Sequence, residues 1–122
     1  MFGFEKLDAW QSAIDYAGQI YLLTEKLPNE EKFGLTNQMR RAAVSVSSNL
    51  AEGSSRSSPK DYLRFVEIAY GSLMETVSQA HIAKQQMFVN NREFERLTES
   101  ADRLARMLSG LRRHLIEKQH EK

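Results

Sequence analysis

The fold is decided by the stretch Arg40-Arg41-Ala42-Ala43-Val44-Ser45-Val46-Ser47-Ser48-Asn49-Leu50-Ala51-Glu52-Gly53. An apolar stripe follows this segment at helical spacing, and a mostly uncharged polar stripe runs beside it. Gly53 stands where a helix commonly stops. Polar groups at the border of a core are costly unless they find partners. We therefore expect the polar stripe to face other helices or another subunit.

The composition is that of one soluble globular domain. The chain has 122 residues, of which 41% are hydrophobic and 27% charged, so one self-sufficient core can form. We take residues 1–122 as a single domain, ordered from about residue 4 to residue 117. Cysteine is absent, which excludes disulfides and thiolate zinc sites and fits a reducing compartment. The formal net charge of +1 differs from that of dedicated nucleic-acid modules, which are far more basic.

The chain shows no pattern for export or membrane insertion. Residues 1–6 lack the basic segment and apolar core of a secretion signal. No apolar run approaches the ~20 residues that span a bilayer. We expect a cytoplasmic protein with no membrane partner.

Apolar residues spaced three and four apart predict four helices. The first begins at an Asp8 N-cap and ends at Leu27, before Pro28. Its apolar seam consists of Leu7, Trp10, Ile14, Ala17, Tyr21 and Thr24, and Ala13 and Ile20 widen it. The second helix starts near Leu35 and ends with Gly53 as a left-handed C-cap.

The third helix should be the longest, from Pro59 to about Phe88, with Ser58 as its N-cap. Its apolar seam is flanked by a second row, which consists of Phe65, Ile68, Ser72, Glu75, Gln79 and Ile82. The two rows cover roughly 200° of the helix, which indicates burial on two sides.

The fourth helix follows a turn at Asn90-Asn91 and keeps 3-4 spacing from Phe94 to Leu115. Because all connections are short, the sequence predicts an all-α, antiparallel up-down-up-down four-helix bundle that is oligomeric.

Polar residues of the second and third helices are placed to pair across a helix interface. The predicted network consists of Gln38, Arg41, Ser45, Asn49, Glu52, Ser72, Glu75 and Gln79. Its expected ion pair joins Arg41 to Glu75 or Glu52. We interpret the set as structural, fixing register as polar residues do at coiled-coil seams, and leave open whether it lies within one chain or between subunits. The alternative is a catalytic pocket that uses Glu52, Glu75, Asn49 and Arg41.

Metal and nucleophile chemistry find no matching pattern. Bundle metal sites use Glu-x-x-His, whereas Glu75 and Glu67 lack a histidine at that offset. The serines of residues 54–58 lack the glycines and lysine of a phosphate loop and are explained as a linker and helix cap. We expect no catalytic residue, no metal, no cofactor and no small-molecule substrate.

Arginines gather on one side of the fourth helix, opposite its leucines. They are Arg92, Arg96, Arg103, Arg106 and Arg113. Glu99 lies among them and Glu95 and Asp102 beside them, so a solvated, salt-bridged face is the first interpretation. The alternative is contact with RNA or DNA phosphates. The residues proposed for that contact are Arg40, Arg56, Arg92, Arg96, Arg103 and Arg106.

Four stretches, in order, resemble one protein family. They are Phe4-Glu5-Lys6-Leu7-Asp8-Ala9-Trp10, Phe33-Gly34-Leu35-Thr36-Asn37-Gln38-Met39-Arg40-Arg41-Ala42, residues 45–53 with Asn49-Leu50-Ala51-Glu52-Gly53, and Gly71-Ser72-Leu73-Met74-Glu75. From about Phe4 to Leu115 the chain is similar to the four-helix-bundle proteins of the 23S ribosomal RNA intervening-sequence family. The resemblance implies a bacterial, cytoplasmic, non-enzymatic bundle that assembles into a homopentamer and whose molecular role is largely unassigned.

A more distant similarity links this family to the accessory variability determinant protein of diversity-generating retroelements, a pentameric bundle that binds nucleic acid and a reverse transcriptase. That relative is strongly basic, whereas this chain is nearly neutral. Our main hypothesis is a self-assembling scaffold whose partner is itself. The alternative is an RNA- or DNA-binding bundle that uses the arginine-bearing face.

Overall fold

The computed structural model describes residues 1–121 and is all-helical. Its long helices are α1 (Asp8–Thr24), α2 (Leu35–Ser54), α3 (Pro59–Gln85) and α4 (Asn91–Gln119). Two short 3-10 helices, η1 (Gly3–Lys6) and η2 (Asn29–Glu31), precede α1 and α2. No strand occurs within the described range. The predicted all-α class with four helices is confirmed.

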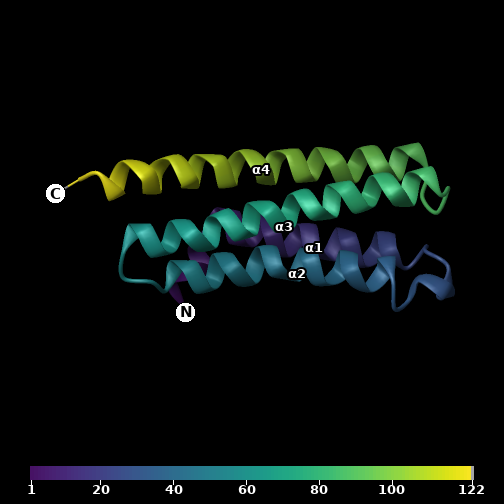
Figure 1. The fold of residues 1–122 in the computed structure, drawn as a ribbon, viewed down its shortest axis with the longest axis horizontal. Coiled ribbons are helices and arrows are strands. Elements are labelled where there is room, and N and C mark those ends of the chain that lie inside the picture. The colour runs from purple at the N-terminus through teal and green to yellow at the C-terminus, as the bar shows by residue number, and fades with distance from the viewer. Residues whose placement is uncertain (122) are drawn as a thin grey trace.

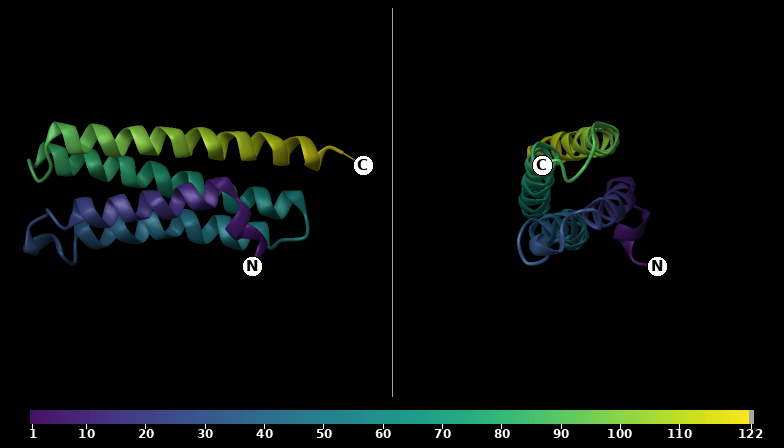
Figure 2. Two further views of the ribbon diagram at one scale, coloured as in Figure 1. Left: turned by 180° about the vertical axis from the view of Figure 1, so that it is seen from behind. Right: turned by 90° about the vertical axis from the view of Figure 1, so that its right-hand side faces the viewer.

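The four helices lie alongside one another (Figure 1), and each contacts the next one along the chain. α2 contacts α1 and α3, and α3 also contacts α4. The end-on view in Figure 2 (right) shows α3 between α2 and α4. α1 and α4, the first and last helices, contact each other as well. No helix of residues 1–121 combines the length and apolar character that a membrane crossing requires.

All four helices contribute to one core. Its largest fully buried side chains are Tyr16, Ile20, Met39, Val46, Leu50, Val66, Leu73, Thr76, Leu104 and Leu108. The Tyr16 hydroxyl lies 2.8 Å from Thr76 Oγ1, which joins α1 to α3 across the core. Because Thr76 Oγ1 already donates to the Leu73 carbonyl, the tyrosine is the donor of this bond.

The buried side of α1 differs from the predicted seam. α1 buries Ala9, Ala13, Tyr16, Ile20 and Leu23. Ile14 is 44% exposed and Tyr21 42% exposed, so most of the predicted seam lies on the flank of the helix. Two alanines let the backbone of α1 approach the core closely, and Tyr16 can be buried because its hydroxyl has a partner.

The ends of α1 were also predicted wrongly. Asp8 is the first helical residue rather than the cap, and the N-cap residue, Leu7, makes no side-chain cap bond. The helix stops at Thr24, whose hydroxyl donates to the Ile20 carbonyl at 2.7 Å. Leu27 is buried in the turn that follows.

Gly53 does not end α2. The helix continues to Ser54, and no glycine of the described residues has a positive φ. A Cβ on Gly53 would lie 2.7 Å from Phe65 Cβ and 3.0 Å from Tyr62 Cδ1. The glycine is needed because α2 and α3 approach closely at this point, and a side chain would force them apart.

α3 and α4 both begin at an N-cap residue whose side chain accepts a hydrogen bond from a backbone amide. Ser58 Oγ accepts from the Asp61 amide at 3.1 Å and Pro59 is the first residue of α3, as predicted. α3 ends at Gln85, three residues before the predicted end, and Met87 turns the chain at φ 62°. At α4, Asn90 Oδ1 accepts from the Glu93 amide while Glu93 Oε1 accepts from the Asn90 amide, which forms a capping box.

The second row of α3 is only partly covered by the chain itself. Phe65 and Ser72 are half-buried and Gln79 is buried. Ile68 is 52% exposed and Ile82 47% exposed. Within a single chain α3 is therefore buried on one side only, and the wide apolar arc leaves two isoleucines in contact with solvent.

Candidate functional site

The outward side of α2 carries unusually little charge for a helix surface. Only Arg40, Arg41 and Glu52 are charged among its 20 residues. Its exposed residues are Asn37, Gln38, Arg41, Val44, Ser48 and Glu52. By contrast, α4 carries charge on 12 of its 29 residues. Solvent-facing helices resemble α4 in this respect, so α2 has the character of a surface meant for contact.

Part of the predicted polar network joins α2 to α3. Ser45 Oγ and Ser72 Oγ form a hydrogen bond of 2.9 Å between the two helices. Asn49 Nδ2 donates to the Ser45 carbonyl at 2.8 Å and to Ser45 Oγ at 3.0 Å. These three residues therefore form one connected, half-buried group.

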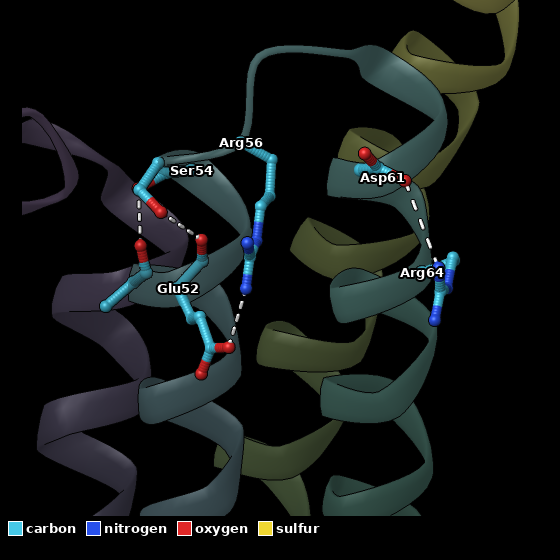
Figure 3. A network of polar contacts seen from close by, with 7 residues as sticks. Glu52, Ser54, Arg56, Asp61 and Arg64 are labelled. Atoms are coloured by element: carbon cyan, nitrogen blue, oxygen red, sulfur yellow. Dashed lines mark hydrogen bonds and ion pairs between the residues drawn. The ribbon is translucent and has the colours of Figure 1, made fainter.

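Glu52 lies apart from this group, at the connection from α2 to α3 (Figure 3). Its Oε2 pairs with Arg56 at 2.9 Å, and the Arg56 guanidinium lies over the Phe65 ring at 4.7 Å. The serines of this connection cap the end of α2, because Ser54 Oγ donates to the Ala51 carbonyl and Ser55 Oγ to the Glu52 carbonyl. Figure 3 also shows Asp61 paired with Arg64, 3.9 Å apart, at the start of α3.

Within the chain, the predicted ion pair of Arg41 with Glu75 or Glu52 does not form. Within residues 1–121 neither Glu52 nor Glu75 lies within 4 Å of the Arg41 guanidinium. Glu75 Oε2 instead accepts from Gln79 Nε2 at 3.2 Å. Gln79 Oε1 is buried and has no hydrogen-bond partner among the described residues. The helical spacing predicted which side of each helix carries the polar residues. It did not predict where along the helix axes those residues lie relative to one another.

Arg41 stands between two surface hollows. One, of about 380 Å³, is lined by Tyr21, Asn37, Arg40, Arg41, Val44 and Ser45, from α1 and α2. The other, of about 300 Å³, is lined by Asn37, Gln38, Arg41, Ala42, Ser45, Ser72 and Glu75, from α2 and α3. The first hollow contains two arginines and no carboxylate.

Two of the arginines proposed for phosphate contact are engaged within the chain. Arg40 Nε donates to Thr24 Oγ1 at 2.8 Å, and its guanidinium lies 4.6 Å from the centre of the Tyr21 ring. Arg56 is held by Glu52 and Phe65 as described. Arg40 therefore links α2 to α1, and Arg56 links the connection after α2 to α3.

The other four lie exposed on α4. Arg106 pairs with Asp102 at 3.0 Å, and Arg103 donates to Ser100 Oγ at 3.2 Å. Arg96 borders a hollow of about 140 Å³ between α1 and α4 that Lys26 and Glu93 also line. Arg92, Arg96, Arg103 and Arg106 therefore share one exposed face, and at least one of them is locally neutralised.

Three structural contacts were not predicted from the sequence. Arg112 pairs with Glu67 at 2.7 Å and covers the Tyr70 ring at 4.7 Å, which ties α4 to α3. Lys26 pairs with Glu93 of the α4 capping box. The residues of each contact are far apart in the sequence, so a local sequence pattern cannot predict these contacts.

Burial raises the pKa of the Tyr16 hydroxyl to about 12, against the smaller opposing effect of its hydrogen bond to Thr76. Burial also raises the pKa of Tyr62. Both tyrosines are therefore held neutral more strongly in the folded chain than in the unfolded one. Across the described chain, no group of three or more His, Cys, Asp or Glu side chains is placed to hold a metal ion.

A solved structure has the same fold. It is the crystal structure of a protein of unknown function from the S23 ribosomal protein family of Bacteroides thetaiotaomicron. The two chains are 20% identical, and the match covers 85% of this chain and 97% of the other with a TM-score of 0.79. No curated protein matches the chain. The model of the 23S rRNA-intervening sequence protein family matches residues 5–110, nearly the whole length, and the chain therefore belongs to this family.

Proposed function

We propose that this protein is a non-enzymatic, cytoplasmic scaffold, an up-down-up-down helical bundle that assembles with copies of itself into a homopentamer. The number of five subunits is what the resemblance of its sequence motifs to the 23S rRNA intervening-sequence family implies. The connections between helices are short enough for consecutive helices to run antiparallel. The proposal rests chiefly on the surface of α2.

The observation that carries the proposal is the pair of apolar patches on either side of α2. On the α1 side, Ile14, Tyr21 and Val44 are each more than 40% exposed. On the α3 side, Ile68 and Ile82 are about half exposed. Between them lies the weakly charged outward side of α2. Neighbouring apolar patches on a soluble chain favour protein contact.

The two patches differ in composition, which favours a ring. When one surface of a subunit binds a different surface of the next, the contact is heterologous, and it forms a ring when the rotation between successive copies closes. α4, which carries more charged residues than any other helix, would then face the solvent outside such a ring.

One residue of the alternative catalytic pocket, Glu52, lies apart from the other three. Glu52 is paired with Arg56, and Asn49 is bonded to Ser45. Arg41 and Glu52 are eleven residues apart on one helix, roughly 16 Å along its axis. A scaffold fits this arrangement better than an enzyme.

Sedimentation equilibrium and native mass spectrometry test the assembly directly. The wild-type protein should have five times the 14.0-kDa mass of one chain at micromolar concentration. Val44→Glu and Ile68→Glu should reduce the mass, because a charge in an apolar contact is costly. Ile116→Glu, at a 40% exposed position on α4, should leave it unchanged. A wild-type protein of single-chain mass would refute the proposal.

A second candidate function is binding of RNA or DNA backbones by α4. It is supported by the shared exposed face of Arg92, Arg96, Arg103 and Arg106 and by the resemblance to a nucleic-acid-binding retroelement protein. A ring would repeat this weak patch, and several weak contacts together bind far more tightly than one.

Binding to structured ribosomal RNA, followed by fluorescence anisotropy, tests this candidate. Affinity should fall steeply between about 50 and 200 mM salt, because arginines release counterions from the phosphates. Changing all four arginines to glutamine should abolish binding. Arg64→Gln on α3 serves as control and should have little effect. Equal binding by the quadruple variant would exclude this face.

A further inference from the structure

Solvent-accessible residues along α1 and α3 recur at intervals of seven. The α1 series is Leu7 at the N-cap, Ile14 and Tyr21, and the α3 series is Ile68, Glu75 and Ile82. Seven residues make nearly two helical turns, so each series lies along one side of its helix. The series on α1 is apolar throughout, whereas the series on α3 has a carboxylate between two isoleucines.

The charges next to these series have opposite sign. Beside the α1 series lies the hollow of about 380 Å³ that contains Arg40 and Arg41 and no carboxylate. Within the α3 series, Glu75 is exposed and uses one carboxylate oxygen to accept from Gln79. An apolar contact between the two patches would therefore bring a carboxylate towards an arginine-lined hollow, which is complementary.

We propose that, in the assembly, the Glu75 carboxylate of one copy enters the arginine-lined hollow of the next copy and binds its Arg41 guanidinium. Ile68 and Ile82 on either side of it cover the apolar groups around that hollow, Tyr21 and Val44. The pair sets which surface of one copy meets which surface of the next. This inference rests on the proposed self-assembly.

The rival arrangement is a pair within one chain, since Arg41 and Glu75 border the same hollow between α2 and α3. In the isolated chain that hollow, of about 300 Å³, separates them and no ion pair forms. Arg40 cannot replace Arg41 freely, because Thr24 and Tyr21 already hold it. Arg41 is left as the exposed guanidinium at the edge of both hollows.

Charge reversal in separate chains distinguishes the two arrangements. Arg41→Glu and Glu75→Arg are each purified, and their masses are measured by sedimentation alone, as an equimolar mixture, and as the double variant. Each single variant places like charges in the contact and should dissociate, with the dissociation constant raised about 100-fold or more. Circular dichroism should show both variants folded, because the two side chains are exposed.

The mixture gives the decisive result. Arg41→Glu chains can bind Glu75→Arg chains through a reversed pair at one contact and a native pair at the next, so species that contain both chains should form. A closed ring of five would keep one contact between like charges, so the expected species are mixed assemblies rather than full recovery of the wild-type mass. Arg113→Glu and Glu99→Arg on α4 make the same charge changes away from α2 and should assemble as the wild type does.

Three results would overturn the inference. Recovery of assembly by the double variant, with no species containing both chains in the mixture, would place the pair within one chain. Single variants with the wild-type mass would remove both residues from the contact. A wild-type protein with a mass of 14.0 kDa would refute self-assembly itself.

Discussion

Tyr16 shows how one polar group can belong to a core of helices. Its ring lies among apolar neighbours and its hydroxyl donates to Thr76 Oγ1 on the far side of the core. Thr76 passes the chain of bonds on to the Leu73 carbonyl. A buried hydroxyl without such a partner would cost free energy, so the bond favours one packing of α1 against α3.

The first prediction concerns this tyrosine and alkaline pH. Its pKa is about 12 in the folded chain, against an ordinary value of 10.0. The folded state keeps the proton longer, so stability is complete below pH 10 and falls as pH rises towards 12. The loss should reach about 1 kcal/mol by pH 11.

Tyr16→Phe should lack this loss, while costing about 0.5–1.5 kcal/mol at neutral pH through the missing hydrogen bond. Urea unfolding of both proteins at pH 8, 10 and 11, at one protein concentration, measures the difference. Parallel curves for the two proteins would show that Tyr16 does not ionise more readily on unfolding.

Gly53 supports a second prediction with an internal control. Alanine is a better helix former than glycine by about 1 kcal/mol, which would favour the substitution. At Gly53 the new Cβ would lie 2.7 Å from Phe65 Cβ, so Gly53→Ala should instead destabilise the protein by about 1–3 kcal/mol.

Gly110→Ala is the matched control. Gly110 is exposed on α4, and an added Cβ would meet only open space there, so this variant should be stabilised by up to about 1 kcal/mol. Thermal unfolding of the two variants measures whether each substitution raises or lowers the stability. Stabilisation by Gly53→Ala would mean that α2 and α3 can separate without cost.

At the scale of whole helices, the capping box of α4 is joined to the turn after α1 by the ion pair between Glu93 and Lys26. Glu93 accepts from the Asn90 amide with one carboxylate oxygen and pairs with Lys26 through the other. The start of α4 is thereby fixed against the turn that follows α1. A single carboxylate thus connects a local helix signal to tertiary packing.

The third prediction follows from this arrangement. Asn90→Ala removes the side chain that satisfies the Glu93 amide and should cost about 1 kcal/mol. Asn91→Ala, one residue later, is the control and should have a smaller effect. Chemical unfolding measures both, and equal losses would show that the cap is not the cause.

The helices themselves could be predicted from the sequence, because spacing and caps are local. Ser58 and Pro59 mark the start of α3 as expected. The orientation of α1 could not be predicted from hydrophobicity, since Ile14 outranks Ala13 on any such scale and yet Ala13 is the buried one. Which residue turns inward depends on how closely the neighbouring backbone approaches, and Gly53 was misread for the same reason.

At the scale of the whole molecule, charge is divided between the helices. α4 carries 12 charged residues and α2 three. The sequence predicted both the polar stripe of α2 and the arginine face of α4. It could not predict that Arg41 forms no ion pair with Glu52 or Glu75 within residues 1–121, because pairing depends on the relative positions of the residues along the helix axes, which helical spacing does not fix.

The fourth prediction tests whether folding and assembly are linked. A partner that binds only the folded chain stabilises it by mass action, so the unfolding temperature should rise with protein concentration. A hundredfold increase should contribute on the order of 2 kcal/mol per chain, enough for a shift of several degrees. Scanning calorimetry of the wild type over that range measures the shift. Arg41→Glu should show no such shift, because the proposed assembly needs that guanidinium. If the unfolding temperature of the wild type did not depend on concentration, the chain would be stable alone and its apolar patches would bind a different partner.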